Sequence, residues 1–245
     1  MRKPHELAVI VPAFNEATVI EASLTQLSAW LGASRWDWEI RVVDDGSDDR
    51  TAAIVRRFAR AEPRVMLQVE PHRGKGAAVR AGMLASDAAY RFLCDADLSM
   101  PPHEIARFMP PHLGETDVAI ASREGVGARR IDEPFLRHLA GRAFNSTVRA
   151  GMLPGIEDTQ CGFKMFTAAA AEAIFPYVTV DGWAFDIEVL YLARRRGFRV
   201  REVPIEWHFR ADTRLRLFPD AFRMFNDLLS VRLRAWRGDY DRRYR

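Results

Sequence analysis

Two aspartates one residue apart, Asp95 and Asp97, close the apolar run in the segment FLCDADLSMPP and are followed at once by prolines. The predicted strand runs through both residues, and its side-chain period of two places their carboxylates on one face, about 7 Å apart. Like charges in that arrangement repel each other unless a cation lies between them. Magnesium and manganese prefer oxygen ligands, often one or two carboxylates together with substrate phosphates. The spacing therefore predicts a divalent cation, Mg²⁺ or Mn²⁺, that carries a diphosphate.

A second pair of acids, Asp44 and Asp45, lies in VVDDGSDDRT, again where an apolar run ends. The glycine and serine fit a tight turn, and one of the next two aspartates fits the cap of a following helix. That structural explanation accounts for residues 46–51 but not for Asp44 and Asp45, which lie where a base or a ribose would be bound. We therefore interpret both as substrate-binding residues.

The segment HRGKGAAVRAG places Lys75 between two glycines at the start of a predicted helix. Free N–H groups and the helix dipole make a helix N-terminus attractive to anions. The spacing matches neither a Walker A loop nor the GxGxxG motif, so as a phosphate site the segment is only suggestive. The absence of GxGxxG after the first predicted strand also argues against nicotinamide-dependent chemistry.

The elements that must position these residues are predicted to be alternating strands and helices. Near-continuous apolar runs separated by helical patterns are typical of an α/β fold, a mostly parallel sheet flanked by helices on both faces. Ligands of such sheets bind at the carboxyl ends of the strands, where the acids and Lys75 fall. The predicted strands are 7–14, 38–45, 65–70, 90–97 and 117–122, and the helices are about 16–32, 50–61, 75–86 and 102–109.

The pattern changes after residue 125. We predict an amphipathic helix at about 132–150, a loop across GIEDTQCGFKMF, a helix at about 184–196, a strand across FRVREVPIEWHF and a last amphipathic helix at about 219–236. No internal repeat or low-complexity linker interrupts the chain. We expect a main domain over residues 1–217 and a C-terminal amphipathic helical extension over residues 218–245.

Composition and charge indicate a globular protein and argue against a disordered chain. The 245 residues are 48% hydrophobic and 28% charged, as in an ordinary globular protein. The net charge is only +3, and of 36 basic residues just Lys3, Lys75 and Lys164 are lysine. Arginine suits phosphate contacts, but a GC-rich genome gives the same bias, and we place that explanation first. We expect no nucleic-acid partner.

Two features bear on the compartment. The cysteines, Cys94 and Cys161, have no metal-ligand spacing and favour a reducing compartment. No signal peptide and no membrane span are expected, because no window is apolar over the length that a bilayer requires.

The ordered motifs VIVPAFNE, VVDDGSDDRT, GKGAAVRAG, CDAD, ASR and EDTQCGFKMF, followed by WAFDIEVLYLA, resemble those of the family-two inverting glycosyltransferases with the GT-A fold. The last two motifs are most similar to the dolichyl-phosphate β-glucosyltransferases, with the dolichyl-phosphate mannosyltransferases as near relatives. The resemblance covers about residues 7–209. The QxxRW signature of processive polysaccharide synthases is absent, which favours a single transfer. The N-terminal anchor of the eukaryotic glucosyltransferases is not expected, since the chain begins almost directly at its first strand.

The resemblance implies roles for individual residues. Catalysis would involve Asp97, Lys164, Asp186 and Glu188, and the metal would be bound by Asp95 and Asp97. Because Asp186 and Glu188 diverge on a helix, we expect one of them to touch the substrate. The implied substrate-binding residues are Pro12, Phe14, Glu16 and Asp44 for the nucleotide base, Lys75 by the uridine or diphosphate, and Arg123, Gln160 and Lys164 for the sugar and phosphate region.

The implied reaction moves one hexose, with UDP-glucose as the favoured nucleotide-sugar donor, to a polyprenyl (dolichyl or undecaprenyl) phosphate with inversion. The acceptor phosphate is largely dianionic at neutral pH, so a dedicated general base is not needed. The metal and Lys75 would stabilise charge on the departing diphosphate, and Arg123, Arg129, Arg130 or Lys164 would hold the acceptor phosphate. The alternatives are a GDP-mannose donor, a non-prenyl acceptor and a catalytically silent nucleotide-sugar sensor.

The last predicted helix is the first candidate for a membrane contact. Its apolar residues recur at spacings of three and four beside arginines, which suits either an interfacial helix on anionic lipid or a helix that covers the domain. A peripheral location on the cytoplasmic, inner face of the membrane is expected. The apolar residues are Phe218, Phe222, Phe225, Leu229, Leu233 and Trp236, the arginines are Arg223, Arg232, Arg234 and Arg237, and the helix at 132–150 offers Phe135, Leu136, Leu139, Phe144 and Val148.

Overall fold

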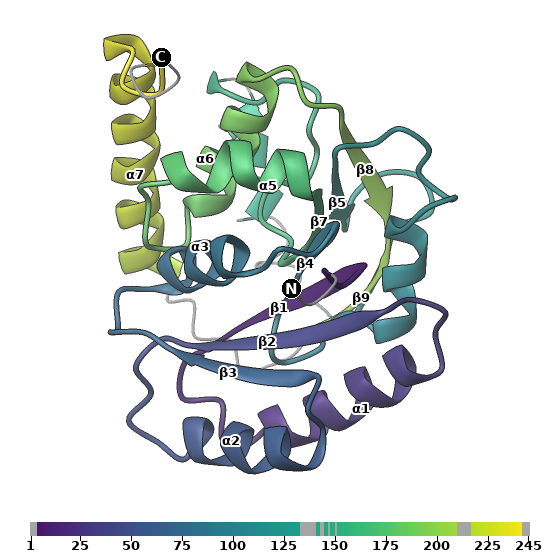
Figure 1. Cartoon of the computed structure of the whole chain (residues 1–245). Coiled ribbons are helices and arrows are strands. Elements are labelled where there is room, and N and C mark those ends of the chain that lie inside the picture. Colours follow the sequence, from purple (N-terminus) through teal and green to yellow (C-terminus); the bar gives the residue numbers. More distant parts are fainter. Residues whose placement is uncertain are drawn as a thin grey trace.

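A seven-stranded sheet forms the centre of the molecule, with strands in the order β3-β2-β1-β4-β7-β5-β8 (Figure 1). The computed structural model describes residues 4–132, 141–142, 145–146, 148–149, 151–209 and 217–241, with side chains in the last range from Arg223 onward. The strands of this sheet are β1 (Leu7–Ala13), β2 (Trp38–Asp44), β3 (Val65–Val69), β4 (Tyr90–Cys94), β5 (Val118–Ser122), β7 (Phe163–Thr167) and β8 (Val200–Pro204). Two short strands, β6 (Arg129–Ile131) and β9 (Glu206–His208), pair in parallel beside it.

Helices cover both faces of the sheet, as predicted (Figure 1). Side chains of β1 alternate between two apolar clusters: Ala8 and Ile10 pack with α3, α5 and α6, whereas Val9 and Val11 pack with α1 and α2. The helices are α1 (Ile20–Gly32), α2 (Thr51–Ala61), α3 (Lys75–Ala85), α5 (Ala168–Ile174), α6 (Phe185–Arg195) and α7 (Leu217–Arg237), with 3₁₀ helices η1 (Pro102–Phe108) and η2 (Phe175–Tyr177).

The strand β7 was not predicted, because its segment was assigned to a loop. It lies between β4 and β5 and runs antiparallel to both, with Lys164 opposite Leu93 on one side and Ile120 on the other. The sheet is therefore mixed. The strand was missed because Lys164 interrupts a short apolar run, and a charged residue there is not expected in a buried central strand.

The strand β4 ends at Cys94, three residues earlier than predicted. Asp95 and Asp97 therefore lie in the following turn, and the inference that strand periodicity places them on one face is wrong. The Leu98 N–H donates to the Asp95 carbonyl at 3.2 Å, and Leu98 has a φ of 47°. A left-handed backbone is uncommon for leucine, so this tight turn is held by its surroundings.

The C-terminal helix α7 both packs and presents an apolar face. Met224, Leu228 and Val231 are buried in the cluster that includes α6. The opposite side exposes Phe225 (47%), Leu229 (48%), Leu233 (50%) and Trp236 (85%). The side chains of Phe218, Phe222, Phe135, Leu136, Leu139 and Phe144 lie outside the described residues.

The predicted boundary after residue 217 falls at the first residue of α7, and the division into two units remains a prediction. In the described ranges, no helix combines the length and apolar character that a membrane crossing requires.

Candidate functional site

Lys75, the first residue of α3, faces the acids that follow β4. Its Nζ lies 2.5 Å from Asp95 Oδ1 and 5.3 Å from the centre of the Trp183 ring. Burial alone would lower the pKa of Lys75, but Asp95, Asp186 and Asp97 together raise it above its ordinary value. Lys75 is thus a permanent positive charge at the carboxyl edge of the sheet.

Backbone contacts close the N-terminus of α3. The N–H groups of Gly76 and Ala77 donate to the Asp181 carbonyl at 2.8 and 3.3 Å. A Cβ on Gly76 would lie 2.4 Å from the Val180 carbonyl oxygen, so only glycine permits this close approach. These two N–H groups are therefore not free for an anion, which removes the helix N-terminus that the sequence suggested as a phosphate site, and the positive charge comes from the Lys75 side chain.

Asp95 and Asp97 are half-exposed in the turn after β4. Asp97 accepts hydrogen bonds from the Ser99 N–H at 2.9 Å and the Ser99 hydroxyl at 2.8 Å. Asp95 rests against Gly162, where a Cβ would lie 1.9 Å from Asp95 Oδ2. Gly162 therefore leaves the space in which the Asp95 carboxylate lies.

The chain offers two carboxylates for a metal at this turn. Within the described residues, no group of three or more His, Cys, Asp or Glu side chains is arranged to hold a metal ion. Asp95 and Asp97 alone would leave most of a coordination shell open, which fits Mg²⁺ or Mn²⁺ that is completed by the phosphates of a nucleotide. The donor set thus fits a metal that binds together with its nucleotide.

Asp186 faces this cluster from α6. Lys164 Nζ lies 2.8 Å from Asp186 Oδ1, in an ion pair, and donates to the Cys161 carbonyl at 2.5 Å. Burial raises the pKa of Asp186, against the opposing effects of Lys164 and Lys75. The Lys164 side chain is fully buried, which does not support its predicted role in lining the substrate site. Lys164 instead neutralises Asp186 from within the sheet.

Glu188, two residues further along α6, points away from this cluster. Its carboxylate is fully buried and accepts hydrogen bonds from Thr179, Val180 and Tyr240. This placement does not support a catalytic role for Glu188. The expected divergence of the two acids is observed, and Asp186 is the one beside the lysines.

Asp44 shapes the loop after β2. It is buried, and its carboxylate accepts from the Ser47 hydroxyl at 2.5 Å and the Ser47 N–H at 3.2 Å. The Ser47 hydroxyl oxygen in turn accepts from the Asn15 N–H at 2.8 Å, and the Asn15 carbonyl oxygen Oδ1 accepts from the Asp48 N–H at 2.8 Å. Asp44 therefore joins the loops that follow β1 and β2.

Asp45 holds the loop that leads to Lys75. Its carboxylate accepts from the N–H groups of Arg73 at 3.0 Å and Gly74 at 2.9 Å, and lies 2.8 Å from His72 Nδ1. The side chain is only 4% exposed. Asp45 is thus engaged by the protein backbone, although it was predicted to bind substrate.

Phe14, predicted to hold the base, stacks on His72 with ring centres 4.1 Å apart and planes 15° from parallel. The rings are in contact, so a base can stack on the pair but cannot enter between them. Pro12 is buried in β1 beside Val43, and the Glu16 carbonyl accepts from the N–H groups of Val19, just before α1, and Ile20, its first residue.

Arg123 is fixed at the end of β5 by a buried acid. Its Nε and Nη2 donate to the two oxygens of Asp158 at 2.6 and 2.9 Å, and its guanidinium lies 5.3 Å from the Trp207 ring centre. Burial alone would raise the pKa of Asp158, but Arg123 lowers it to about 2. Gln160, half-exposed, donates its backbone N–H to the same carboxylate at 3.3 Å.

Sequence reasoning missed several residues of the site. Asp158 lies in the quoted EDTQCGFKMF motif but was given no role, and Gly162 lies in the same motif. His72 and Trp183 open the quoted segments HRGKGAAVRAG and WAFDIEVLYLA, but neither was given a role. Their positions depend on which loops meet at the carboxyl edge.

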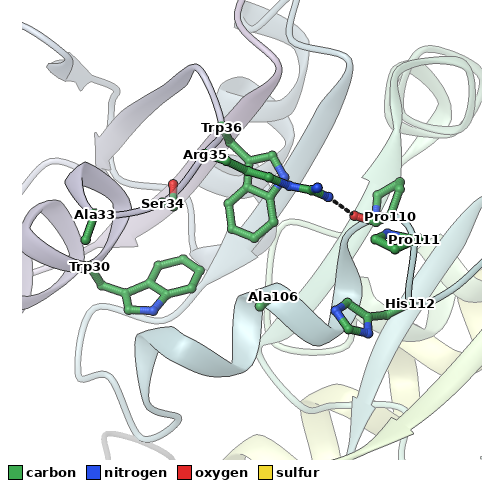
Figure 2. A pocket seen from close by; sticks show the side chains of 9 residues that line it. All are labelled: Trp30, Ala33, Ser34, Arg35, Trp36, Ala106, Pro110, Pro111 and His112. Atoms are coloured by element: carbon green, nitrogen blue, oxygen red, sulfur yellow. Dashed lines mark hydrogen bonds between the residues drawn. The ribbon is translucent and has the colours of Figure 1, made fainter.

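A separate cavity of about 390 Å³ lies near the amino end of β2, away from these acids (Figure 2). Arg35 Nη2 donates to the Pro110 carbonyl at 2.7 Å, and the rings of Trp30 and Trp36 are 5.7 Å apart. No carboxylate or lysine lines it; the lining residues are Trp30, Ala33, Ser34, Arg35, Trp36, Ala106, Pro110, Pro111 and His112. It therefore lacks the paired charges of the carboxyl edge.

Comparison with known proteins agrees with the resemblance seen in the motifs. Residues 8–175 match the family described as Glycosyl transferase family 2. A dolichyl-phosphate β-glucosyltransferase of Dictyostelium discoideum is 32% identical, over 95% of this chain and 75% of the relative. Relatives of the same name are 32% identical in Saccharomyces cerevisiae, over 96% and 76%, and 30% identical in Homo sapiens, over 97% and 79%.

Solved structures of glucosyl-3-phosphoglycerate synthase from Mycobacterium tuberculosis share the fold. The complex with UDP has a TM-score of 0.67 at 19% identity and covers 93% of this chain and 80% of its own. The complex with Mn²⁺, UDP-glucose and phosphoglyceric acid has a TM-score of 0.65 at 17% identity, with coverages of 93% and 79%. The predicted GT-A fold is thereby confirmed.

Proposed function

Because the chain belongs to glycosyl transferase family 2 and is a glycosyltransferase, we propose that it transfers a single glucose from UDP-glucose to a polyprenyl phosphate, dolichyl or undecaprenyl, with inversion. The dolichyl-phosphate β-glucosyltransferases that match nearly the whole chain support this choice of sugar and acceptor. The observation that carries the proposal is the contact of Lys75 with Asp95, beside Asp97, at the carboxyl edge. It supplies one cation and two acids where a nucleotide diphosphate can bind.

The donor's leaving group is the first thing that the site must stabilise. When the bond between the anomeric carbon and the diphosphate breaks, UDP leaves with the bonding electron pair. Lys75 is held in place before the reaction, so its charge can stabilise the departing oxygens without reorganisation. Phe14 and His72 offer an aromatic surface for the base.

A divalent cation, Mg²⁺ or Mn²⁺, would be held by Asp95 and Asp97 and would supply further positive charge for the diphosphate. Lys75 already contacts Asp95, so the protein alone balances part of the charge of the turn. Asp186 approaches the same region from α6. Its side chain is only 4% exposed, so we infer that it acts on the site through its charge beside Lys75 and Lys164 and that a contact with the sugar requires the donor to bind directly over it.

The acceptor phosphate attacks the anomeric carbon from the face opposite the leaving group, which inverts its configuration. The phosphate is largely dianionic at neutral pH and needs no side chain to remove a proton. Arg123 is held by Asp158, and Arg130 donates to Glu124 Oε1 at 2.5 Å. Arg129 is 74% exposed with a surface ion pair to Glu206, and we infer that it meets the incoming phosphate.

A transfer assay tests the function. The full chain is given polyprenyl phosphate in detergent with UDP-glucose, UDP-N-acetylglucosamine or GDP-mannose, with and without Mg²⁺ or Mn²⁺. We expect metal-dependent glucolipid from UDP-glucose. Product from GDP-mannose would identify a mannosyltransferase. In a parallel reaction with a water-soluble acceptor and no lipid, product there and none with polyprenyl phosphate would reject the prenyl substrate, and donor binding without product in either reaction would identify a silent sensor.

The acceptor's tail lies in lipid, and α7 is the element that we propose contacts the membrane. Its outer face exposes four apolar side chains, Phe225, Leu229, Leu233 and Trp236. The arginines Arg223, Arg232 and Arg237 on the same helix are exposed. Apolar residues beside cationic ones suit the interface of an anionic bilayer. We place the protein at the cytoplasmic face, since Cys94 and Cys161 are buried free thiols.

Co-sedimentation with anionic vesicles tests this contact. We expect Leu229→Ser with Leu233→Ser to reduce binding about tenfold, as loss of buried apolar area predicts. Leu84→Ser is the matched control, because Leu84 is a 46% exposed leucine on α3. Unchanged binding of the double variant would assign the outer face of α7 to another role.

A further inference from the structure

A buried carboxylate on α6 joins two segments that are distant in sequence. Glu188 accepts from the Thr179 hydroxyl and N–H, both at 2.7 Å, from the Val180 N–H at 2.8 Å and from the Tyr240 hydroxyl at 2.6 Å. Its side chain has no exposed surface. Four donors match the accepting capacity of an ionised carboxylate, so these contacts satisfy Glu188.

The segment that Glu188 holds also contacts the N-terminus of α3, which is distant in sequence. Asp181 accepts from the N–H of Gly76 through its carbonyl oxygen, at 2.8 Å. Arg80, one turn further along α3, donates to the Val178 carbonyl at 2.7 Å and lies 3.2 Å from Asp181 Oδ1. Residues 178–181 are therefore fixed to α6 on one side and to the first turns of α3 on the other.

The fourth donor comes from the turn after α7. Tyr240 is 4% exposed and packs near Tyr191, with ring centres 6.2 Å apart. Burial and the Glu188 charge raise the pKa of Tyr240, so its hydroxyl keeps the proton that it donates. The C-terminal turn is in this way hydrogen-bonded to the acid that orders residues 179 and 180.

We propose that Tyr240 and Glu188 are positioning residues of the donor site, which hold residues 178–181 so that Lys75 is directed at Asp95. Lys75 immediately precedes Gly76, and Trp183, just beyond the held segment, lies 5.3 Å from Lys75 Nζ. Residues 178–181 are thus linked to Lys75 in two ways: through the hydrogen bonds of Asp181 with the first turn of α3, and through the Trp183 ring that follows them. The inference rests on the proposed function only where it assigns the nucleotide diphosphate to Lys75.

Amide hydrogen exchange on the full chain tests the structural part of this proposal without substrate. Tyr240→Phe removes one hydroxyl and keeps the ring. We expect exchange about tenfold faster in residues 178–181 and 75–78, as local opening becomes easier. Tyr191→Phe, the matched control, removes a hydroxyl from the neighbouring ring and should leave both segments unchanged. Unaltered exchange in Tyr240→Phe would overturn the proposal.

Thr179→Val provides a second variant should Tyr240→Phe fail to fold. It removes only the exposed threonine's hydroxyl donor to Glu188 Oε1. The same two segments should exchange faster, and protection equal to that of the unaltered chain would count against the proposal in the same way.

A double-mutant cycle tests the route through Lys75. We expect Tyr240→Phe to raise the Kd for UDP with Mn²⁺ about fivefold, a size typical of coupled contacts. The same change in a Lys75→Ala background should have no further effect. Equal weakening in both backgrounds would overturn the route through Lys75. Absence of UDP binding to the unaltered chain would contradict the proposed function, and the exchange result would then decide the positioning role alone.

Discussion

The acids after β2 and those after β4 lie at the same edge of one sheet but have different partners. Asp44 and Asp45 are buried and accept hydrogen bonds from backbone N–H groups and a serine hydroxyl. Asp95 is half-exposed and faces the Lys75 ammonium, and Asp97, also half-exposed, accepts from the Ser99 N–H and hydroxyl in its own turn. The first pair is buried and shapes loops. The second pair is half-exposed, and we propose that it presents charge to a ligand, although Asp97 also orders its own turn.

The difference shows that position at a strand end does not define a role. Buried acids that accept from the backbone fix where neighbouring loops go, and their removal leaves N–H groups without acceptors. Half-exposed acids beside a lysine can exchange partners when a cation and a diphosphate arrive. The same contrast recurs on α6, where Glu188 holds backbone and Asp186 faces the lysines.

The largest effect is expected from Asp97→Ala. Transfer should fall by about 10³-fold, the size seen when one preorganised electrostatic contact is lost. Asp97 is half-exposed but also accepts from the Ser99 N–H and hydroxyl, so the melting temperature should fall by a few degrees while the chain stays folded at the assay temperature. Asp87→Ala, an exposed acid just before β4, is the control for activity and melting. Full transfer by Asp97→Ala would remove the distinction between the two pairs of acids.

Asp45→Ala should act on stability. It leaves the N–H groups of Arg73 and Gly74 without their acceptor, so we expect the free energy of unfolding to fall by about 2 kcal/mol. Chemical denaturation measures this loss, and Asp95→Ala, which removes a half-exposed acid, should lose less. A larger loss for Asp95→Ala would reverse the assignment.

Asp158 is a third buried acid that shapes loops, here at the end of β5. Its contribution to the free energy of unfolding should depend on pH. Its pKa is about 2 when folded, below the ordinary 3.8, so its stabilisation is complete above that ordinary value and is lost as the pH falls through 2. The expected loss is about 2 kcal/mol. Denaturation of wild type and Asp158→Asn between pH 5 and 2 measures it. Equal slopes for the two proteins would contradict the ion pair with Arg123.

Gly162→Ala should give the smallest effect and sharpen the comparison. The added methyl would displace the Asp95 carboxylate, so transfer should fall about tenfold, as expected for a misplaced catalytic group. Gly151→Ala is the control, because nothing lies within 4 Å of a Cβ there. Transfer assays at saturating UDP-glucose compare the two variants, and equal activity would mean that Gly162 does not set the position of Asp95.

Much of the fold followed from the apolar runs, because β1, β2 and β5 are buried on both faces and read as continuous hydrophobic segments, and the partly buried edge strand β3 is still a short apolar run. The strand β7 did not, since Lys164 interrupts its pattern and Asp186, which compensates that charge, lies on a distant helix. The predicted strand also extended too far, through Asp95 and Asp97, whereas β4 ends at Cys94. The turn that follows depends on a left-handed backbone at Leu98, which no sequence pattern indicated.

Lys75 and Asp95 were both assigned to the carboxyl edge, and the structure brings them into contact although β2 and β1 separate β3 from β4 in the sheet. Their roles in binding remain predictions. The roles of Asp45 and Glu188 depend on which backbone N–H groups each carboxylate reaches, and no local pattern encodes that. The partnership of Glu188 with Tyr240 spans 52 positions of the chain.

The most direct test of the contrast between the two pairs of acids is Mn²⁺ binding in the presence of UDP, followed by electron paramagnetic resonance. We expect the unaltered chain and Asp45→Asn to bind the ion and Asp97→Ala to lose it. Retained binding by Asp97→Ala, or equal loss by Asp45→Asn, would contradict the assignment of the cation to the turn after β4.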